Sequence, residues 1–236
     1  MLVKTQAIVL RNTNFRENSI ISKMYTREFG IRSYIFHSIR KGKSAIRPSM
    51  IQPLSLVDME VYEKAGTSIN KVKELRNVPL LLSTQGDMYK KSIALFLVEI
   101  LNNCLTEEMC DEELFVYIRG QILKIENKDV GALFSSVFLI GLSKYLGVEP
   151  QGHFSEESKY FDLEEGVFVA QEGLNTLDNQ TSLLILLILH SQENDLPSIK
   201  TQVRRDTLNA LIKYYQIHIM KYKEIKSVQI LSELLE

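Results

Sequence analysis

Four basic side chains lie within eight consecutive residues of the chain, at Arg40, Lys41, Lys43 and Arg47. A glycine lies in the middle of this basic segment, and the segment contains no acidic residue. Such a segment cannot bury itself, so it concentrates positive charge in solvent beside whatever surface carries it. Cations arranged in this way bind the phosphates of nucleic acids. The alternative is a solvated hairpin tip with no ligand.

The residues before the basic segment predict a β-strand over 31–39. In a strand, Ile31, Ile35 and Ile39 would share one face, because side chains alternate between the two faces. The other face would carry Arg32, Tyr34, Phe36 and Arg40. Basic groups interleaved with aromatic rings suit a single strand of nucleic acid, since cations follow phosphates and rings stack on bases.

The charge of the chain is unevenly distributed, although its formal net charge is only −1. Residues 1–80 carry 14 Lys and Arg against 6 Asp and Glu, a net charge of +8, and residues 81–236 carry 14 against 23, a net charge of −9. This asymmetry favours a basic module for a polyanion joined to an acidic body. Two cysteines are too few for a disulfide framework and predict a reducing cytoplasm. Lys4 interrupts any N-terminal apolar run, and no apolar run is long enough for a membrane span.

The first 80 residues predict a small closed β-barrel. Five short segments have the composition or alternation of strands, and tight turns connect most of them. Gly30 can adopt the positive φ that such a turn often needs. An OB-fold is the expected fold, because it is a five-stranded barrel that binds oligonucleotides. The predicted strands are residues 3–11, 19–26, 31–39, 49–62 and 68–75.

After Pro79 the apolar residues repeat at helical spacing. Helices are predicted around 93–104, 114–125, 133–146, 183–189 and 208–219, with a β-hairpin over 161–169. Cys104 falls on the apolar face of its helix and is expected in a core. The 183–189 helix is apolar all round and is expected to be buried. The fold class is therefore α+β, with an OB-fold domain at 1–80 and a mainly helical domain at 81–236 that contains the hairpin.

The sequence favours no catalytic chemistry and no cofactor. Gly42-Lys43-Ser44 matches the end of a phosphate-binding loop, but His37 occupies the position of the first glycine that this motif needs. The four histidines are scattered, and the two cysteines lie six residues apart, so no metal-ligand spacing occurs. We expect a protein that binds and does not catalyse.

The order of several motifs resembles the RecO family of bacterial recombination mediators. The resemblance is closest over residues 4–62 and extends over essentially the whole chain. The matching segments are Lys4 to Arg11, Tyr25 to Arg32, Arg40 to Ser44 with Arg47, Gln52 to Leu54, Glu60 to Tyr62, Leu142 to Pro150, the hairpin and the final long helix.

This resemblance implies a protein that binds single- and double-stranded DNA and anneals complementary strands. The implied partners are RecR, the C-terminal tail of single-stranded DNA-binding protein and, indirectly, RecA. The implied location is the bacterial cytoplasm, at the nucleoid. Many members of the family carry a four-cysteine zinc motif, but residues 151–158 contain no cysteine, so no zinc is expected.

Two sets of residues are predicted to bind ligands. The DNA-binding set is Arg11, Arg16, Arg32, Tyr34, Arg40, Lys41, Lys43 and Arg47. An acidic tail that ends in an apolar residue needs a hydrophobic pocket with a basic rim, and the candidates for that rim are Arg119, Arg204, Arg205 and Lys213. The alternative function is a protein–protein adaptor whose barrel is a docking surface with incidental affinity for polyanions.

Overall fold

The computed structural model describes residues 1–37, 39, 45–64, 66–107, 109–190 and 197–234. The chain forms two compact units, Met1–Lys128 and Asp129–Glu236. The first unit therefore contains the barrel and the helices that directly follow it. The domain boundary near residue 80 stays a prediction.

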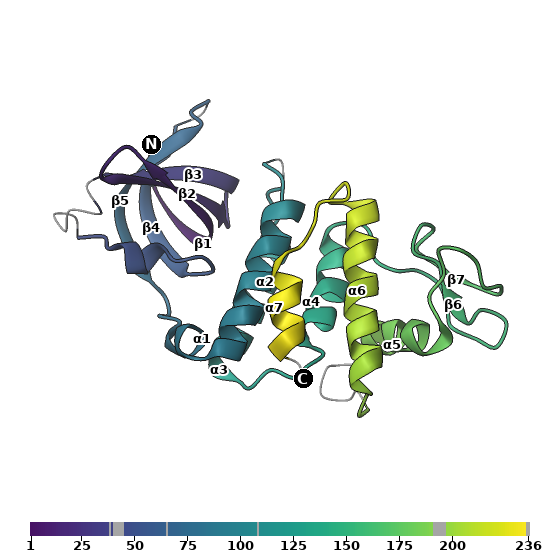
Figure 1. Cartoon of the computed structure of the whole chain (residues 1–236). Coiled ribbons are helices and arrows are strands. Elements are labelled where there is room, and N and C mark those ends of the chain that lie inside the picture. Colours follow the sequence, from purple (N-terminus) through teal and green to yellow (C-terminus); the bar gives the residue numbers. More distant parts are fainter. Residues whose placement is uncertain (38, 40–44, 65, 108, 191–196, 235–236) are drawn as a thin grey trace. The chain divides into compact units, whose positions relative to one another are not determined.

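The first unit begins with a closed five-stranded barrel, as predicted (Figure 1). Its strand order is β1-β2-β3-β5-β4, with β3 and β5 parallel and every other pair antiparallel. This closed arrangement is that of the OB-fold. The strands are β1 (Leu2–Phe15), β2 (Ser19–Thr26), β3 (Gly30–Phe36), β4 (Leu56–Tyr62) and β5 (Ile69–Asn77). The first strand is longer than predicted because a register shift between Val9 and Arg11 lets it continue along β2.

The turn from β2 to β3 depends on Gly30. Its φ is +63°, as the sequence predicts for this turn. A Cβ atom there would lie 2.5 Å from the carbonyl oxygen of Met109, in the segment before α3 (Glu112–Asn127). Any other residue would therefore strain the turn and collide with the backbone next to the barrel.

The alternation of the strands places apolar side chains in the barrel interior. Val57, Met59 and Val61 of β4 point inward, while Asp58 and Glu60 between them are half-exposed. The same interior contains Tyr34 and Phe36 of β3, with exposed fractions of 0% and 3%. Both faces of the predicted 31–39 strand hold apolar residues, and within β3 Tyr34 and Phe36 are the ones that lie in the barrel core. Ile39 also belongs to this core, because the strand ends at Phe36 and the alternation does not continue to residue 39.

The prediction of a continuous extended segment over 49–62 is wrong at its start. Residues Pro48–Ile51 form a short 3-10 helix with Pro48 in its first turn. Proline fixes φ near the helical value and has no N–H to lose, so it favours a helix start. Strand β4 begins only at Leu56.

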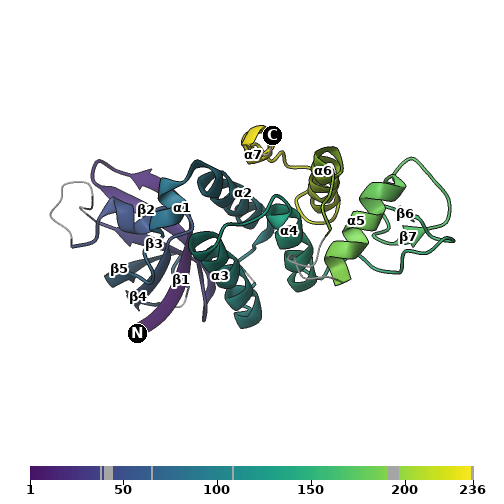
Figure 2. The same ribbon diagram turned by 90° about the horizontal axis from the view of Figure 1, so that it is seen from below.

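Three helices complete the first unit: α1 (Leu82–Gly86), which the sequence did not predict, α2 (Met88–Cys104) and α3. Helices α2 and α3 lie side by side next to the barrel (Figure 2). The Tyr25 hydroxyl donates to the Asp111 carbonyl oxygen at 3.1 Å, and the Asn102 amide donates to the Leu10 carbonyl oxygen at 3.0 Å. Burial raises the pKa of Tyr25 to about 12, so the phenol stays a neutral donor. Cys104 is buried, as predicted.

The second unit packs helices against a small hairpin. Its elements are α4 (Phe134–Tyr145), β6 (Tyr160–Phe161), β7 (Phe168–Val169), α5 (Asn179–His190), α6 (Thr201–His218) and α7 (Ser227–Leu234). The Tyr215 hydroxyl of α6 donates to the Leu139 carbonyl oxygen at 2.5 Å and joins α6 to α4. The prediction that the 183–189 helix is buried on all sides is wrong, because Leu183 of α5 is 39% exposed. The sequence analysis did not predict α7, because this helix has only eight residues and begins soon after the end of α6. No helix among the described residues is long and apolar enough to cross a lipid bilayer.

Candidate nucleic-acid interface

The end of the basic segment is held in place by two asparagines inside one end of the barrel. The Asn12 amide donates to the Ile51 carbonyl oxygen at 2.5 Å, and the Asn77 amide donates to the Met50 carbonyl oxygen at 2.8 Å. These bonds fix the 3-10 helix, whose N-terminal flanking residue is Arg47. The Arg47 side chain is exposed. Arg40, Lys41 and Lys43 lie outside the described residues.

Two further predicted cations lie on either side of Asn12 in the sequence, Arg11 in β1 and Arg16 in the turn after it. Arg11 is exposed and directly precedes Asn12, whose amide holds the 3-10 helix. Arg11 pairs in register with Lys23 of β2, a cation that the sequence prediction missed. Only the strand register brings these two charges together. Arg16 is exposed in the turn after β1, with its guanidinium carbon 5.2 Å from the centroid of the Phe15 ring, within reach of a cation–π contact.

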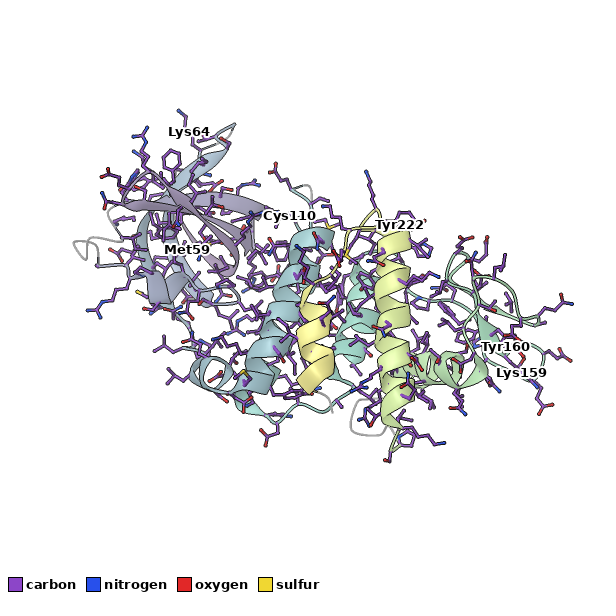
Figure 3. All side chains as sticks on the ribbon, viewed as in Figure 1. Met59, Lys64, Cys110, Lys159, Tyr160 and Tyr222 are labelled. Carbon is purple, nitrogen blue, oxygen red and sulfur yellow. The ribbon has the colours of Figure 1, made fainter. Side chains whose placement is uncertain are left out.

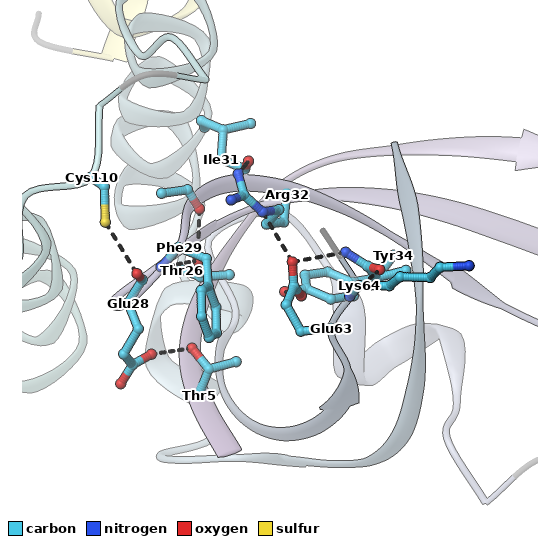
Figure 4. Close-up of polar contacts among 12 residues, drawn as sticks. Thr5, Thr26, Glu28, Phe29, Ile31, Arg32, Tyr34, Glu63, Lys64 and Cys110 are labelled. Atoms are coloured by element: carbon cyan, nitrogen blue, oxygen red, sulfur yellow. Dashed lines mark hydrogen bonds and ion pairs between the residues drawn. The ribbon is translucent and has the colours of Figure 1, made fainter. Parts of the chain in front are cut away.

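The two predicted site residues on β3 have local partners instead of open surface (Figure 4). The Arg32 Nε donates to Glu63 at 3.1 Å, and the Tyr34 hydroxyl donates to the same carboxylate at 3.4 Å. The Asn70 amide adds a third donor at 2.9 Å. Burial raises the pKa of Tyr34.

The prediction that Tyr34 contacts DNA is corrected by this burial. A base can stack only on an exposed ring, and the Tyr34 side chain has no exposed surface. Tyr34 is therefore a core residue of the barrel. Arg32 keeps a partly exposed side chain, but its charge is already paired.

The four candidate tail-binding residues have different environments. Arg119 is half-buried in α3 of the first unit. Arg204 donates from its guanidinium to the Ile199 carbonyl oxygen at 2.6 Å and to the Thr201 hydroxyl at 3.1 Å, which supports the start of α6. Arg205 is half-buried on the same helix.

Lys213 is exposed and lines a cavity of about 250 Å³ in the second unit. The cavity is also lined by the apolar side chains of Leu163, Leu177 and Ala210, and by Asp206. Of the four candidates, only Lys213 lines this cavity.

Within the part of the chain that the structure describes, no group of three or more His, Cys, Asp and Glu side chains could hold a metal ion. Cys104 is buried, and the exposed Cys110 donates from its sulfur to the Glu28 carbonyl oxygen at 3.2 Å (Figure 4). Both cysteines lie in the first unit, far in sequence from the hairpin.

Two family models match the chain in succession. The model described as "Recombination protein O N terminal" matches residues 1–79, and the model described as "Recombination protein O C terminal" matches residues 85–227. Together they cover both structural units. The chain belongs to the RecO family.

Full-length relatives agree with this RecO assignment. The chain is 32% identical to the DNA repair protein RecO of Azobacteroides pseudotrichonymphae over 98% of both chains. It is 30% identical to the DNA repair protein RecO of Flavobacterium johnsoniae over 99% of both, and 30% identical to that of Porphyromonas gingivalis over the full length of both.

In this RecO-family chain, aromatic contacts hold the hairpin where the sequence lacks the four cysteines. The rings of Phe161 and Phe168 meet at 5.2 Å between centroids, and Phe161 meets Tyr214 of α6 at 5.7 Å. The Tyr214 hydroxyl donates to the Val148 carbonyl oxygen at 2.9 Å. His218 bonds the Leu163 carbonyl oxygen at 2.9 Å, which ties the turn of the hairpin to the same helix. Phe161, Leu163 and Phe168 are all buried.

Proposed function

We propose that this protein is a DNA repair mediator that binds single- and double-stranded DNA and anneals complementary strands. Together with RecR, it would help RecA load onto strands coated with single-stranded DNA-binding protein. It acts by binding, without a catalytic step or a cofactor, in the bacterial cytoplasm at the nucleoid. Membership of the RecO family and the names of the full-length relatives support this proposal.

The observation that carries the proposal is the group of cations around the anchored 3-10 helix. Arg11 and Arg47 are both exposed, and Arg47, the last cation of the basic segment, directly precedes the 3-10 helix. Each cation that neutralises a phosphate releases a counterion, so the binding free energy gains from every contact without reading the bases. Bringing complementary strands together needs this kind of contact, because it must hold both strands whatever their sequence.

The direct test replaces Arg40, Lys41, Lys43 and Arg47 with alanine and measures DNA binding as a function of salt concentration. If all four contact phosphate, the slope of log affinity against log salt should flatten by up to about 3 units for single strands. The loss should be similar for oligonucleotides of different sequence. An unchanged slope in a folded variant would mean that the segment is a solvated tip.

A matched control removes the same amount of charge from the second unit. Its four replaced cations are all exposed: Lys144, Lys200, Lys221 and Lys223. This variant should keep the wild-type slope. Annealing of complementary oligonucleotides coated with the cognate single-stranded DNA-binding protein then tests the mediator function itself.

The alternative function, a protein–protein adaptor, is favoured by a different face of the barrel. A surface cavity of about 510 Å³ there is lined by Glu28, Asp58, Glu60 and Glu74 together with Lys4 and Arg76. Four carboxylates against two cations would repel phosphate and could dock a protein instead. An adaptor would bind DNA weakly and lose it quickly as salt rises, so the same salt titration separates the two functions.

The proposed partner in the second unit is the acidic tail of single-stranded DNA-binding protein. The cavity beside Lys213 offers apolar side chains and one exposed cation, which are the features that an acidic tail with an apolar end requires, together with one carboxylate, Asp206, whose charge opposes such a tail.

A further inference from the structure

The outer face of β4 carries an exposed aromatic ring at the end where the strand leaves the barrel. Tyr62 is the last residue of β4, and its side chain is 50% exposed. Its neighbour Val61 is fully buried in the barrel. Because side chains alternate along a strand, Tyr62 points outward, away from the core.

The strand register places Tyr62 in the middle of a short row across three strands. Its partner on β1 is Leu2 and its partner on β5 is Lys71. Leu2 is 42% exposed, and Ile69, two residues before Lys71 on the same face, is 36% exposed. Directly opposed side chains on one face lie close together. The ring therefore lies on a small apolar ridge that water reaches.

Lysines surround this ridge. Lys71 is the cross-strand partner of Tyr62, Lys64 lies two residues beyond it, and Lys4 lies two residues beyond Leu2. All three are exposed, and among the described residues none of them forms an ion pair. Lys64 lies at the outer end of the β4–β5 hairpin (Figure 3).

The nearest acidic groups are mostly already paired. Glu63 accepts from Arg32 and Asn70, and Glu60 accepts from the Lys73 ammonium at 2.8 Å. Glu74, which lies opposite Glu60, is the acidic residue on this side that keeps a negative charge without an ion pair among the described residues. Lys4, Glu60 and Glu74 also line the acidic cavity described above, which continues along the same outer face. The positive side of Tyr62 is therefore the one that carries Lys64 and Lys71.

We propose that Tyr62 is a base-stacking residue for a single strand of nucleic acid, with Lys64 and Lys71 as its phosphate contacts. An exposed ring between exposed lysines has the chemistry that single-strand binding uses: the ring takes a base and the ammonium groups take the phosphates on either side. This inference rests on the proposed DNA-binding function and names a site within it. It also supplies the exposed ring that Tyr34, buried in the core, cannot supply.

The absence of tryptophan from the sequence permits a sharp test. The variant Tyr62→Trp carries a single tryptophan, and a base stacked on it quenches its fluorescence. We expect an oligothymidylate to quench this tryptophan strongly, and a blunt duplex to quench it much less because its bases are already stacked. The control is Tyr222→Trp, at an exposed tyrosine of the second unit, whose emission should change little (Figure 3).

Affinity measurements complete the test. Tyr62→Ala should weaken single-strand binding by about 5- to 150-fold without changing the salt slope, and Tyr62→Phe should restore most of the affinity. Replacing Lys64 and Lys71 with alanine should instead flatten the slope by about 1.4 units.

The outcomes distinguish this site from the proposed function. If the wild-type protein binds no DNA, the function itself fails. If the wild type binds DNA but Tyr62→Ala binds equally well and the fluorescence of Tyr62→Trp is unquenched, the function stands and the stacking site is refuted. Quenching of the Tyr222→Trp variant to the same degree would also refute it, because the signal would then not be specific to the ridge.

Discussion

The Nε atom of Arg32 donates to the Glu63 carboxylate at 3.1 Å, across 31 residues of sequence. The same carboxylate receives the Tyr34 hydroxyl and the Asn70 amide, and its side chain is only 15% exposed. Glu63 thus connects β3 with the turn between β4 and β5, where the barrel closes.

Glu63→Ala is expected to destabilise the barrel. The change leaves the buried Tyr34 hydroxyl and the buried Asn70 amide without their acceptor, which should cost about 2–4 kcal/mol. The control is Glu60→Ala, which removes a partly exposed ion pair with Lys73 and should cost much less than Glu63→Ala. Urea unfolding followed by circular dichroism measures both. Equal losses would show that the Glu63 network contributes no more than a surface pair.

Tyr34 is expected to matter for stability and not for stacking. Tyr34→Ala should cost about 3–5 kcal/mol, as for other large aromatic side chains removed from a core. Tyr34→Phe removes only the hydroxyl, should lose about 0.5–1.5 kcal/mol and should stay folded. Its affinity for single-stranded DNA, measured by salt titration, should match that of the wild type. A clear loss of affinity in folded Tyr34→Phe would contradict the core assignment.

Glu126 is expected to make the first unit sensitive to acid. Its carboxylate accepts from the backbone N–H groups of Ser83 and Thr84 at 2.8 Å each, and from the Thr84 hydroxyl. Burial opposes ionisation, but these donors outweigh it and lower the pKa of Glu126 below its ordinary value of 4.5. A lowered pKa stabilises the folded state at pH values above the unfolded pKa, and this contribution is lost as the pH falls through the folded pKa.

The measurement compares thermal unfolding of the wild type and Glu126→Gln between pH 7 and pH 3. The difference in melting temperature should be largest near pH 7 and should shrink below about pH 4.5. Glu113→Gln, at an exposed residue in the first turn of the same helix, is the control and should change the melting temperature much less. A difference that does not vary with pH would rule out the charge of Glu126 as its cause.

The hairpin of the second unit is expected to need aromatic packing and no zinc. Elemental analysis should find no stoichiometric zinc, and a chelator should leave the melting temperature unchanged. Phe161→Ala removes the ring that contacts both Phe168 and Tyr214 and should cost about 3–5 kcal/mol. One tightly held zinc ion per chain would overturn this prediction.

Lys213 is expected to contribute to binding of an acidic tail peptide. Lys213→Glu places a negative charge at the rim of the apolar cavity and should lower the affinity for the peptide by about three- to tenfold. The control Lys200→Glu reverses an exposed charge that does not line this cavity. Reversal of Arg204 and Arg205 together tests the other candidates, although Arg204 also supports the start of α6. Fluorescence anisotropy of a labelled peptide measures each affinity.

The sequence predicts the barrel well because its signals are local. Alternation along Val57 to Val61, the glycine at 30 and the change to helical spacing after Pro79 each depend on neighbouring residues. Alternation separates two faces of a strand, but it does not say which face is inside when both carry apolar residues. For this reason the sequence predicts Tyr34 on the outer face, whereas the ring lies inside the barrel.

The polar partners of the site could not be read from the sequence. Arg32 and Glu63, or Arg11 and Lys23, meet only because distant strands pair in one register. Tyr62 is a different case. Val57, Met59 and Val61 alternate with Asp58, Glu60 and Tyr62, so the pattern did contain a signal for an outward ring at the end of β4.

Because two asparagines hold the 3-10 helix, the stability of the barrel should not depend on how many cations the basic segment contains. The barrel end is fixed at Met50 and Ile51, so the residues before Pro48 join two points whose spacing the fold already sets. The entropy of loop closure rises slowly with length, so lengthening such a connection costs only about 0.6 kcal/mol for each doubling of its length. A longer segment with more lysines should therefore fold as well as this one and hold DNA more tightly, which makes affinity for polyanions a property that can change by insertion alone.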